Sequence, residues 1–142
     1  MNKDVLAATQ KMDQKLLKLK PFESIQIPKK GWINEIRNCL NITTRRLGKR
    51  CKKPISAQAI IDIERSEQEG TISLNTLHKI ASAMNMKVVY GFVPIEDSLT
   101  KQMKNHVVNE MEGKLSSKIE KKSLELDALK VLRNFPSDFW DK

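Results

Sequence analysis

Pro54 separates two helical patterns that lie only a few residues apart, and it limits what the middle of the chain can fold into. Helical geometry is disfavoured for the residue before a proline, so a helix that runs from Thr44 to about Cys51 has to end before Pro54. Ser56 can then cap a second helix that runs to about Arg65, because a serine hydroxyl accepts hydrogen bonds from the first backbone N–H groups of a helix. The sequence therefore predicts two helices joined by a short turn.

Helical spacing of apolar residues predicts further helices on both sides of this pair. They cover residues 3–19, 32–40, 73–84 and 95–135, the last with a break near Gly113. The aromatic content of 5% and the five glycines and five prolines leave little material for a turn-rich β fold. We therefore expect an all-α fold.

Residues 87–94 (KVVYGFVP) are the exception, because valine and aromatic residues favour a β-strand. A single strand is not stable and needs a pairing partner. Two partners are open: the segment 24–27 (SIQI), or the same strand of a second subunit. The predicted fold is accordingly all-α with one short β-strand.

The formal net charge of +9 is concentrated in the first part of the chain. Residues 1–55 contain 14 Lys/Arg and 4 Asp/Glu, whereas residues 56–142 contain 12 and 13. The excess peaks in residues 45–53 (RRLGKRCKK), which include six basic side chains. Such a cluster attracts phosphate groups, although a solvated helix surface would show the same pattern.

Cys39 and Cys51 are the only cysteines, and they form no C-x-x-C pair. His78 and His106 lie at no zinc-ligand spacing from them, so we expect no metal and no other cofactor. Both cysteines are expected to be reduced and buried. Cys39 shares the predicted inward face of its helix with other apolar residues, namely Trp32, Ile36 and Leu40.

Several functional classes have no support in the sequence. No apolar run approaches the roughly 20 residues that cross a bilayer, and the first residues lack the apolar segment of a signal peptide. We therefore expect a cytoplasmic protein without membrane association. No glycine-rich phosphate loop, no H-E-x-x-H motif and no Ser/His/Asp set is recognisable, so we do not expect an enzyme.

A basic helix followed by a short turn and a capped second helix is the arrangement of helix-turn-helix DNA-binding domains. In these domains the first helix crosses the DNA backbone and the second lies in the major groove. The competing interpretation is a helical bundle in which the capped helix only packs against its neighbours.

Three motifs resemble the helix-turn-helix domains of the Xre/Cro repressor family: I-T-T-x-x-L, I-S-x-x-x-I-x-x-I-E and T-L-x-x-I-A-x-A-M, within residues 31–86. This lambda-repressor-like resemblance becomes tighter with P-K-K-G-W-I-N-E-I-R-N-C-L, E-x-x-E-x-x-G-T-I-S-L-x-T-L and V-V-Y-G-F-V-P. Together these stretches are similar to the group called mobile mystery protein A.

The Xre resemblance implies a DNA-binding surface on the two helices. Thr44 would meet a phosphate at the start of the first helix, and Ser56 would cap the second helix close to the phosphates. Gln58 would be the main base reader, because its amide can pair with both N6 and N7 of adenine. The residues implied to contact DNA are Thr44, Arg45, Arg46, Lys53, Ser56, Ala57, Gln58, Ile61, Asp62 and Arg65.

Three of these residues would contribute in other ways to the recognition of bases. Ala57 or Ile61 could contact the methyl group of thymine. Asp62 could accept a hydrogen bond from N4 of cytosine, or it could deter binding to wrong sequences.

The remaining residues of the motif are expected to be structural. Ile60 and Ile63 face the core by their spacing, and Glu64 is expected to cap or to pair locally with an arginine. Two features depart from the family pattern. Gly48 stands where a small alanine is usual, at a cost of about 1 kcal/mol in helix propensity, and the turn of residues 52–55 is two residues longer.

The resulting prediction is a sequence-specific transcriptional repressor that binds double-stranded DNA as a homodimer and regulates its own operon. Dimerisation would place two recognition helices about one DNA turn apart on a palindromic operator. The alternative follows from the resemblance, because genes of this group tend to lie beside a Fic/Doc-type protein. The chain would then be an antitoxin that inhibits this neighbour.

Inhibitors of Fic proteins carry a helix with Ser/Thr-x-x-x-Glu-Gly/Asn. Residues 108–113 (VNEMEG) place Glu112 and Gly113 correctly but have valine where the hydroxyl belongs.

The predicted organisation has three segments. Residues 1–30 form an N-terminal helix and linker, residues 31–94 form the helix-turn-helix domain with the short strand, and residues 95–142 form a C-terminal helical extension. The extension is expected to dimerise or to bind a partner. Phe139 and Trp140 near its end are expected to dock on the chain's own core or on that partner.

Overall fold

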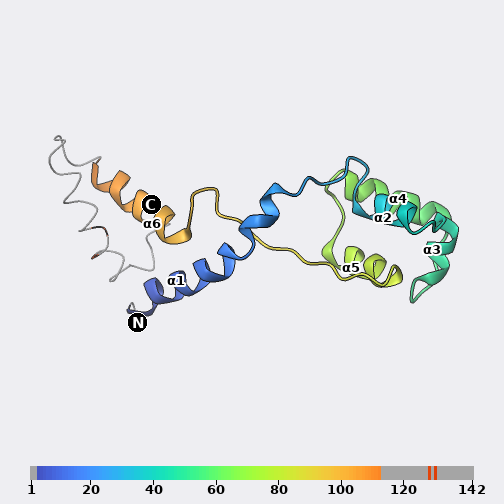
Figure 1. Cartoon of the computed structure of the whole chain (residues 1–142), viewed down its shortest axis with the longest axis horizontal. Coiled ribbons are helices and arrows are strands. Elements are labelled where there is room, and N and C mark those ends of the chain that lie inside the picture. Colours follow the sequence, from blue (N-terminus) through green and yellow to red (C-terminus); the bar gives the residue numbers. More distant parts are fainter. Residues whose placement is uncertain (1–2, 113–127, 129, 131–142) are drawn as a thin grey trace. The chain divides into compact units, whose positions relative to one another are not determined.

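The structure of the chain, a computed structural model, describes residues 3–112, 128 and 130 (Figure 1). The described residues form two units. One comprises residues 25–90, and the other comprises the described residues on either side of it. All regular secondary structure in the described part of the chain is helical, so the all-α prediction is confirmed there.

Four helices build the unit of residues 25–90: α2 (Trp32–Cys39), α3 (Thr44–Arg50), α4 (Ala57–Gln68) and α5 (Leu74–Ala83). Each helix contributes apolar side chains to one core, whose buried members are Ile33, Ile42, Leu47, Ile60, Ile80, Ala83 and Met84. The two predicted helices on either side of Pro54 are present as α3 and α4. Helix α4 continues to Gln68, three residues beyond the predicted end at Arg65.

Hydroxyl side chains begin three of these four helices. Each accepts a hydrogen bond of 3.1 Å from the backbone N–H three residues later, and the caps are Thr43, Ser56 and Ser73. Capping of this kind stabilises a helix by about 1 kcal/mol. The predicted cap Ser56 is confirmed, Ser73 caps α5 at the predicted start of its helix, and Thr43 caps α3.

Helix α2 has no hydroxyl cap, and a carboxylate from α4 takes this role. Oε1 of Glu67 accepts a hydrogen bond from the backbone N–H of Trp32, and Oε2 accepts one from Ile33, both at 2.9 Å. Gly31 precedes the helix with φ of 83°, and a Cβ there would lie 2.7 Å from Oε2 of Glu67. The positive φ favours glycine at residue 31, and a side chain there would displace the carboxylate of Glu67 from the start of α2.

Glu64, one helical turn before Glu67, also connects α4 to α2. It is buried, with 9% of its surface exposed, and accepts hydrogen bonds from Arg37 Nε at 2.6 Å and from Asn34 Nδ2 at 2.8 Å. Arg37 also donates to the carbonyl oxygen of Ile42 at 3.0 Å. Glu64 thus pairs with an arginine as expected, but the expectation of a local partner is wrong, because Arg37 lies 27 residues away.

The inward face of α2 also differs from the prediction. Trp32 and Leu40 are 43% and 49% exposed and Cys39 is exposed, whereas Ile33 is buried. The two carboxylates of α4 explain this difference, because α2 has to turn Arg37 and the N–H of Ile33 toward α4. The prediction that Cys39 is buried is therefore wrong.

The turn between α3 and α4 lies directly against α3. The backbone N–H of Ile55 donates to the carbonyl oxygen of Gly48 at 3.1 Å. A Cβ on residue 48 would come within 2.3 Å of the carbonyl oxygen of Ile55, so a larger residue would displace the turn. Gly48 and the longer turn, the two departures from the family pattern, are therefore parts of one structural feature.

The other unit contains α1 (Lys3–Leu17), the 3-10 helix η1 (Lys20–Ser24) and α6 (Leu99–Glu112). Its apolar cluster combines side chains of α1 with the buried residues Met103, Val107 and Ala128. Helix α1 of the predicted N-terminal segment thus shares a unit with α6 of the predicted C-terminal extension.

Asp13 of α1 provides the N-terminal cap of α6. Its Oδ1 accepts a hydrogen bond from the N–H of Leu99 at 2.7 Å, and its Oδ2 accepts one from the hydroxyl of Thr100 at 2.6 Å and one from the N–H of Thr100 at 3.1 Å. Burial acts to raise the pKa of Asp13, but the hydrogen bonds from Thr100 and Leu99 stabilise the ionised form and leave the pKa below its ordinary value.

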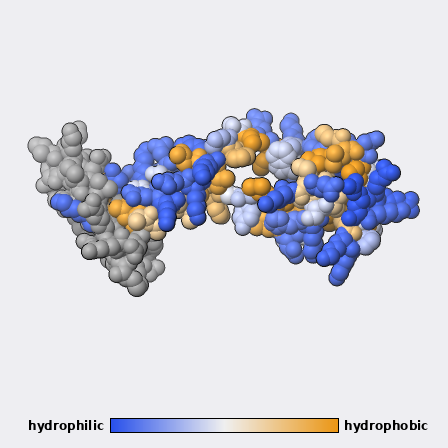
Figure 2. Space-filling view, turned by 60° about the horizontal axis from the view of Figure 1, so that its bottom comes forward, coloured by the Kyte–Doolittle hydropathy of each residue, from blue (hydrophilic) through white to orange (hydrophobic). Residues whose placement is uncertain are grey.

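The predicted β-strand is absent: residues 87–94 form no strand, nor do residues 24–27, in the part of the chain that the structure describes. Val89, Tyr90 and Phe92 are between 64% and 78% exposed. The composition of residues 87–94 is not sufficient to form a strand, because no described segment pairs with their backbone. Figure 2 shows exposed apolar residues between hydrophilic ones on the visible face.

Two expectations fall on residues that the structure does not describe. The predicted second C-terminal helix, which ends near Phe135, is described only at Ala128 and Lys130, and both are helical. Phe139 and Trp140 lie outside the described residues. Among the described helices, none combines the length and apolar character needed to cross a bilayer.

Replacing Gly48 with alanine should destabilise the unit of residues 25–90. The same change in an ordinary helix stabilises by about 1 kcal/mol, whereas here the added Cβ meets the backbone of the turn and should cost about 1–3 kcal/mol. Urea unfolding followed by circular dichroism measures the difference. Lys49→Ala, at an exposed neighbouring position, should change stability by less than about 0.5 kcal/mol. A more stable Gly48→Ala variant would contradict the close contact.

Acidification should weaken the contact between α1 and α6. The pKa of Asp13 is lower in the folded chain than the unfolded value of about 3.9. Its contribution is therefore present above this unfolded value and is lost as the pH falls through the folded value. Between about pH 5 and about pH 3, urea titrations should show a larger loss of stability in the wild type than in Asp13→Asn. Equal losses would mean that ionisation of Asp13 does not stabilise the unit.

Candidate nucleic-acid interface

The outer face of α4 carries a short row of polar side chains. Gln58, Asp62 and Arg65 are exposed, and Ile61 beside them is 39% exposed. On the opposite face Ile60 is fully buried in the core. The helical period and the buried face thus direct the central part of the predicted reading surface toward solvent.

Two other predicted contact residues are less accessible. Ala57 and Thr44 are both half-buried at the starts of their helices. Ser56 is exposed, but its hydroxyl oxygen already accepts the capping hydrogen bond from Ala59. The first residue of each helix is therefore less accessible than the residue that follows it, Arg45 in α3 and Gln58 in α4.

Asp62 organises the polar row on α4. The amide nitrogen Nε2 of Gln58 donates to Oδ1 of Asp62 at 3.1 Å, and Arg65 NH1 lies 3.6 Å from the same oxygen. All three side chains are exposed, so these contacts add little to stability. Their effect is to orient Gln58, since Asp62 restrains the amide that would otherwise rotate freely.

Six basic side chains follow along α3 and the turn, and all are exposed: Arg45, Arg46, Lys49, Arg50, Lys52 and Lys53. None of them forms an ion pair with any residue that the structure describes. By contrast, the carboxylates of Glu64 and Glu67 are directed into α2. The positive charge of the segment therefore has no ion-pair partner within the described residues.

The unit of residues 25–90 holds most of the positive excess of the chain. It contains 12 Lys/Arg and 5 Asp/Glu, a balance of +7 out of the total of +9. Because two of its five acids are engaged with α2, the surface of this unit can attract an anionic polymer.

The contacts of Glu64 and Glu67 with α2, which fix the orientation of α4, were not predicted from the sequence. The spacing of Glu64 and Glu67 places both carboxylates on one helix face, and this part of the pattern is visible in the sequence. Their partners, Arg37 and the N-terminus of α2, are more than 25 residues away and could not be paired with them from periodicity.

No group of three or more His, Cys, Asp or Glu side chains that could hold a metal ion occurs among the described residues. Cys51 is half-buried with its thiol 3.5 Å from the carbonyl oxygen of Leu47, and burial raises the pKa of this thiol. The unit thus offers a charged surface rather than a cluster of reactive groups in its described part.

Comparison of the chain with models of known families, with curated proteins and with solved structures gives no match. The resemblance to the Xre/Cro family and to the mobile mystery protein A group therefore stays a prediction from the motifs.

Replacement of Glu64 with alanine should destabilise the unit by about 3 kcal/mol, because it leaves the guanidinium of Arg37 buried without its carboxylate. Asp62→Ala is the matched control on the exposed face of the same helix and should cost less than about 1 kcal/mol. Urea unfolding measures both values. Similar costs for the two variants would contradict a structural role that is specific to Glu64.

Proposed function

We propose that residues 25–90 bind double-stranded DNA as a helix-turn-helix domain of the Xre/Cro type and that the protein is a transcriptional repressor. The observation that carries this proposal is the run of six exposed basic side chains along α3 and the turn, without an ion-pair partner among the described residues, next to the exposed polar row of α4. In this arrangement α4 enters the major groove and α3 crosses the backbone.

The basic side chains supply affinity that does not depend on sequence. Arg45, Arg46 and Lys53 bind phosphates and release their counterions, and each such contact steepens the decrease of affinity with salt concentration. These side chains form no ion pair with the carboxylates that the structure describes, so no such pair has to break when DNA binds.

Gln58 supplies the main base contact, and Asp62 positions it. A primary amide carries two N–H donors and one carbonyl acceptor. One donor of Gln58 is used by Asp62, which leaves the second donor for N7 of adenine and the carbonyl oxygen for the N6 amino group. The carboxylate of Asp62 thereby selects an orientation of the amide that suits adenine.

The repressor acts as a homodimer. A single module of this size makes few base contacts, and two copies related by a two-fold axis double them. Their recognition helices read half-sites centred about 34–36 Å apart, so the operator is a palindrome.

Gln58→Ala and Arg46→Ala should separate base reading from phosphate binding. A duplex is first selected from a randomised library, and gel-shift titrations then compare it with a scrambled duplex. Gln58→Ala should weaken binding to the selected duplex by about tenfold or more and leave the scrambled duplex unaffected. Arg46→Ala should weaken both to a similar extent and reduce the salt slope by about 1.

Lys15→Ala is the matched control, because Lys15 is an exposed cation of α1 in the other unit. It should change neither affinity nor salt slope. Absence of any complex at low salt, or equal losses on both duplexes for Gln58→Ala and Arg46→Ala, would contradict the proposal.

The alternative of a Fic/Doc-type partner gains no support from the described residues. Val108, at the position where the inhibitory motif has a hydroxyl, packs against the buried Met103 and Val107. The structure does not describe Gly113 or the side chain of Glu112. Co-purification with a Fic/Doc-type protein encoded next to this chain would still be the direct test of that alternative.

A further inference from the structure

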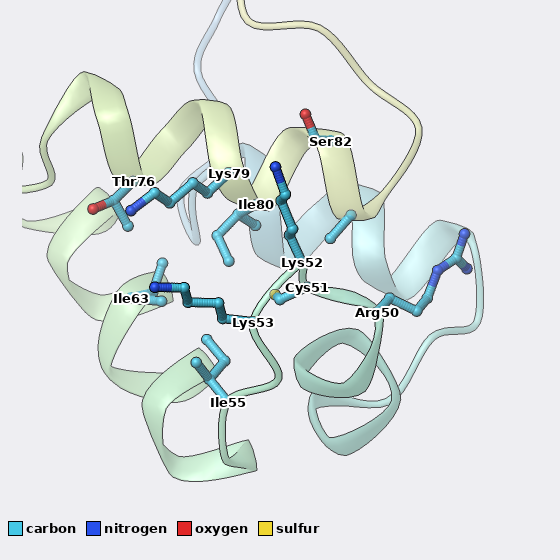
Figure 3. Close-up of a pocket in the computed structure, with 11 residues that line it drawn as sticks. Arg50, Cys51, Lys52, Lys53, Ile55, Ile63, Thr76, Lys79, Ile80 and Ser82 are labelled. Atoms are coloured by element: carbon cyan, nitrogen blue, oxygen red, sulfur yellow. The ribbon is translucent and has the colours of Figure 1, made fainter.

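A pocket of about 820 Å³ opens within the unit of residues 25–90, between the end of α3, the turn, α4 and α5 (Figure 3). This volume lies in the range of about 300–1,000 Å³ that is usual for sites that bind small molecules. Among the predicted DNA contacts, only Lys53 lines it.

The interior of the pocket is apolar. Its lining includes Ile55 from the turn, Ile63 from α4, and Ile80 and Ala83 from α5, together with the thiol of Cys51. Ile80 and Ala83 are almost completely buried, whereas Ile55 and Ile63 are half-buried and present their remaining surface to the pocket. An apolar body placed here would remove this surface from water, which favours binding.

Ammonium groups surround this apolar interior. Lys52 and Lys53 come from the turn and Lys79 comes from α5, and Figure 3 shows their side chains around the three isoleucines. All three lysines are exposed, and no aspartate or glutamate lines the pocket. Arg50 is also part of the lining, but it points away from the lysines in Figure 3.

We propose that this pocket binds a small molecule with an apolar body and one anionic head group, a carboxylate or a phosphate, and that the bound molecule weakens binding to DNA. The charge of the pocket selects the head group, because the three ammonium groups have no acidic partner in the lining. The isoleucines select the body, because a bare anion would leave their surface in contact with water.

The effect on DNA follows from a shared residue, and this second part of the inference depends on the proposed DNA-binding function. Lys53 belongs both to the predicted phosphate contacts and to the pocket. An anionic head group held by Lys52 and Lys53 neutralises charge that would otherwise bind the DNA backbone. The ligand and DNA therefore compete for the same cations.

Protection of Cys51 from alkylation tests ligand binding without DNA. Cys51 lines the pocket, whereas Cys39 is exposed on α2 and is not part of the lining, so it serves as an internal reference in the same molecule. Burial raises the pKa of the Cys51 thiol, so the reaction with N-ethylmaleimide is followed at mildly alkaline pH by peptide mass spectrometry.

Decanoate, below the concentration at which it forms micelles, is the anionic amphiphilic probe. At ten times its half-protecting concentration it should slow alkylation of Cys51 about tenfold and leave Cys39 unchanged. Decyltrimethylammonium, with a similar apolar body and the opposite charge, and inorganic phosphate, with no apolar body, should not protect. Equal protection by either of these, or no protection by decanoate, would overturn the proposal, whereas decyl phosphate is expected to protect as decanoate does.

Lys79→Glu reverses one charge of the pocket at an exposed position outside the predicted DNA contacts. It should raise the half-protecting concentration of decanoate about tenfold, while Lys49→Glu, an exposed lysine of α3 outside the lining, should leave it unchanged. Equal shifts in the two variants would show that only the net charge of the unit matters and would overturn the site.

Gel-shift titration with the selected duplex tests the competition. Decanoate should weaken DNA binding by wild type about tenfold, and the Lys79→Glu variant should require a higher concentration for the same effect. Protection of Cys51 with no change in DNA affinity would overturn the competition alone. Failure of the proposed DNA-binding function would instead appear as absence of a complex without ligand, and the Cys51 protection would remain interpretable.

Discussion

Two carboxylates on the inner face of α4 hold this helix against α2, and the surface offered by residues 25–90 depends on them. Glu64 forms a buried ion pair with Arg37, and Glu67 accepts two backbone hydrogen bonds at the N-terminus of α2. A buried carboxylate is tolerated because these partners replace the hydrogen bonds that it loses to water. With the inner face fixed in this way, Gln58 and Asp62 have to lie on the outer face.

The second constraint is the contact between Gly48 and the turn. The missing side chain at Gly48 lets the backbone of Ile55 approach α3, so that a turn of greater length still delivers the chain to Ser56 at the start of α4. The same turn contributes Lys52, Lys53 and Ile55 to one wall of the pocket. The turn thus links the proposed DNA surface to the proposed ligand site, since both use its cations.

Local interactions explain which parts of the fold could be predicted. The caps at Ser56 and Ser73 and the break at Pro54 act within a few residues, so α3 ends before Pro54 and α4 and α5 begin directly after their capping serines. The outer position of Gln58 followed from the helical period, with Ile60 opposite it. The helix α2 and its inward Ile36 were predicted, but the inward placement of Trp32, Cys39 and Leu40 was wrong. The face of α2 was set by two acids more than 25 residues away rather than by its own apolar spacing.

The absence of the predicted strand at residues 87–94 also shows that local composition is not sufficient. The composition favoured a β-strand, but a strand forms only when a second segment pairs with it. The joining of α1 with α6 through Asp13 was likewise not visible from either segment alone. The sequence by itself determined the helical class, the helix starts around Pro54 and the concentration of positive charge, because capping, backbone sterics and charge are local properties. Only the tertiary structure decided which carboxylates bind internal partners, which basic residues are exposed to solvent, and where a pocket lies. These features depend on contacts between residues far apart in the chain.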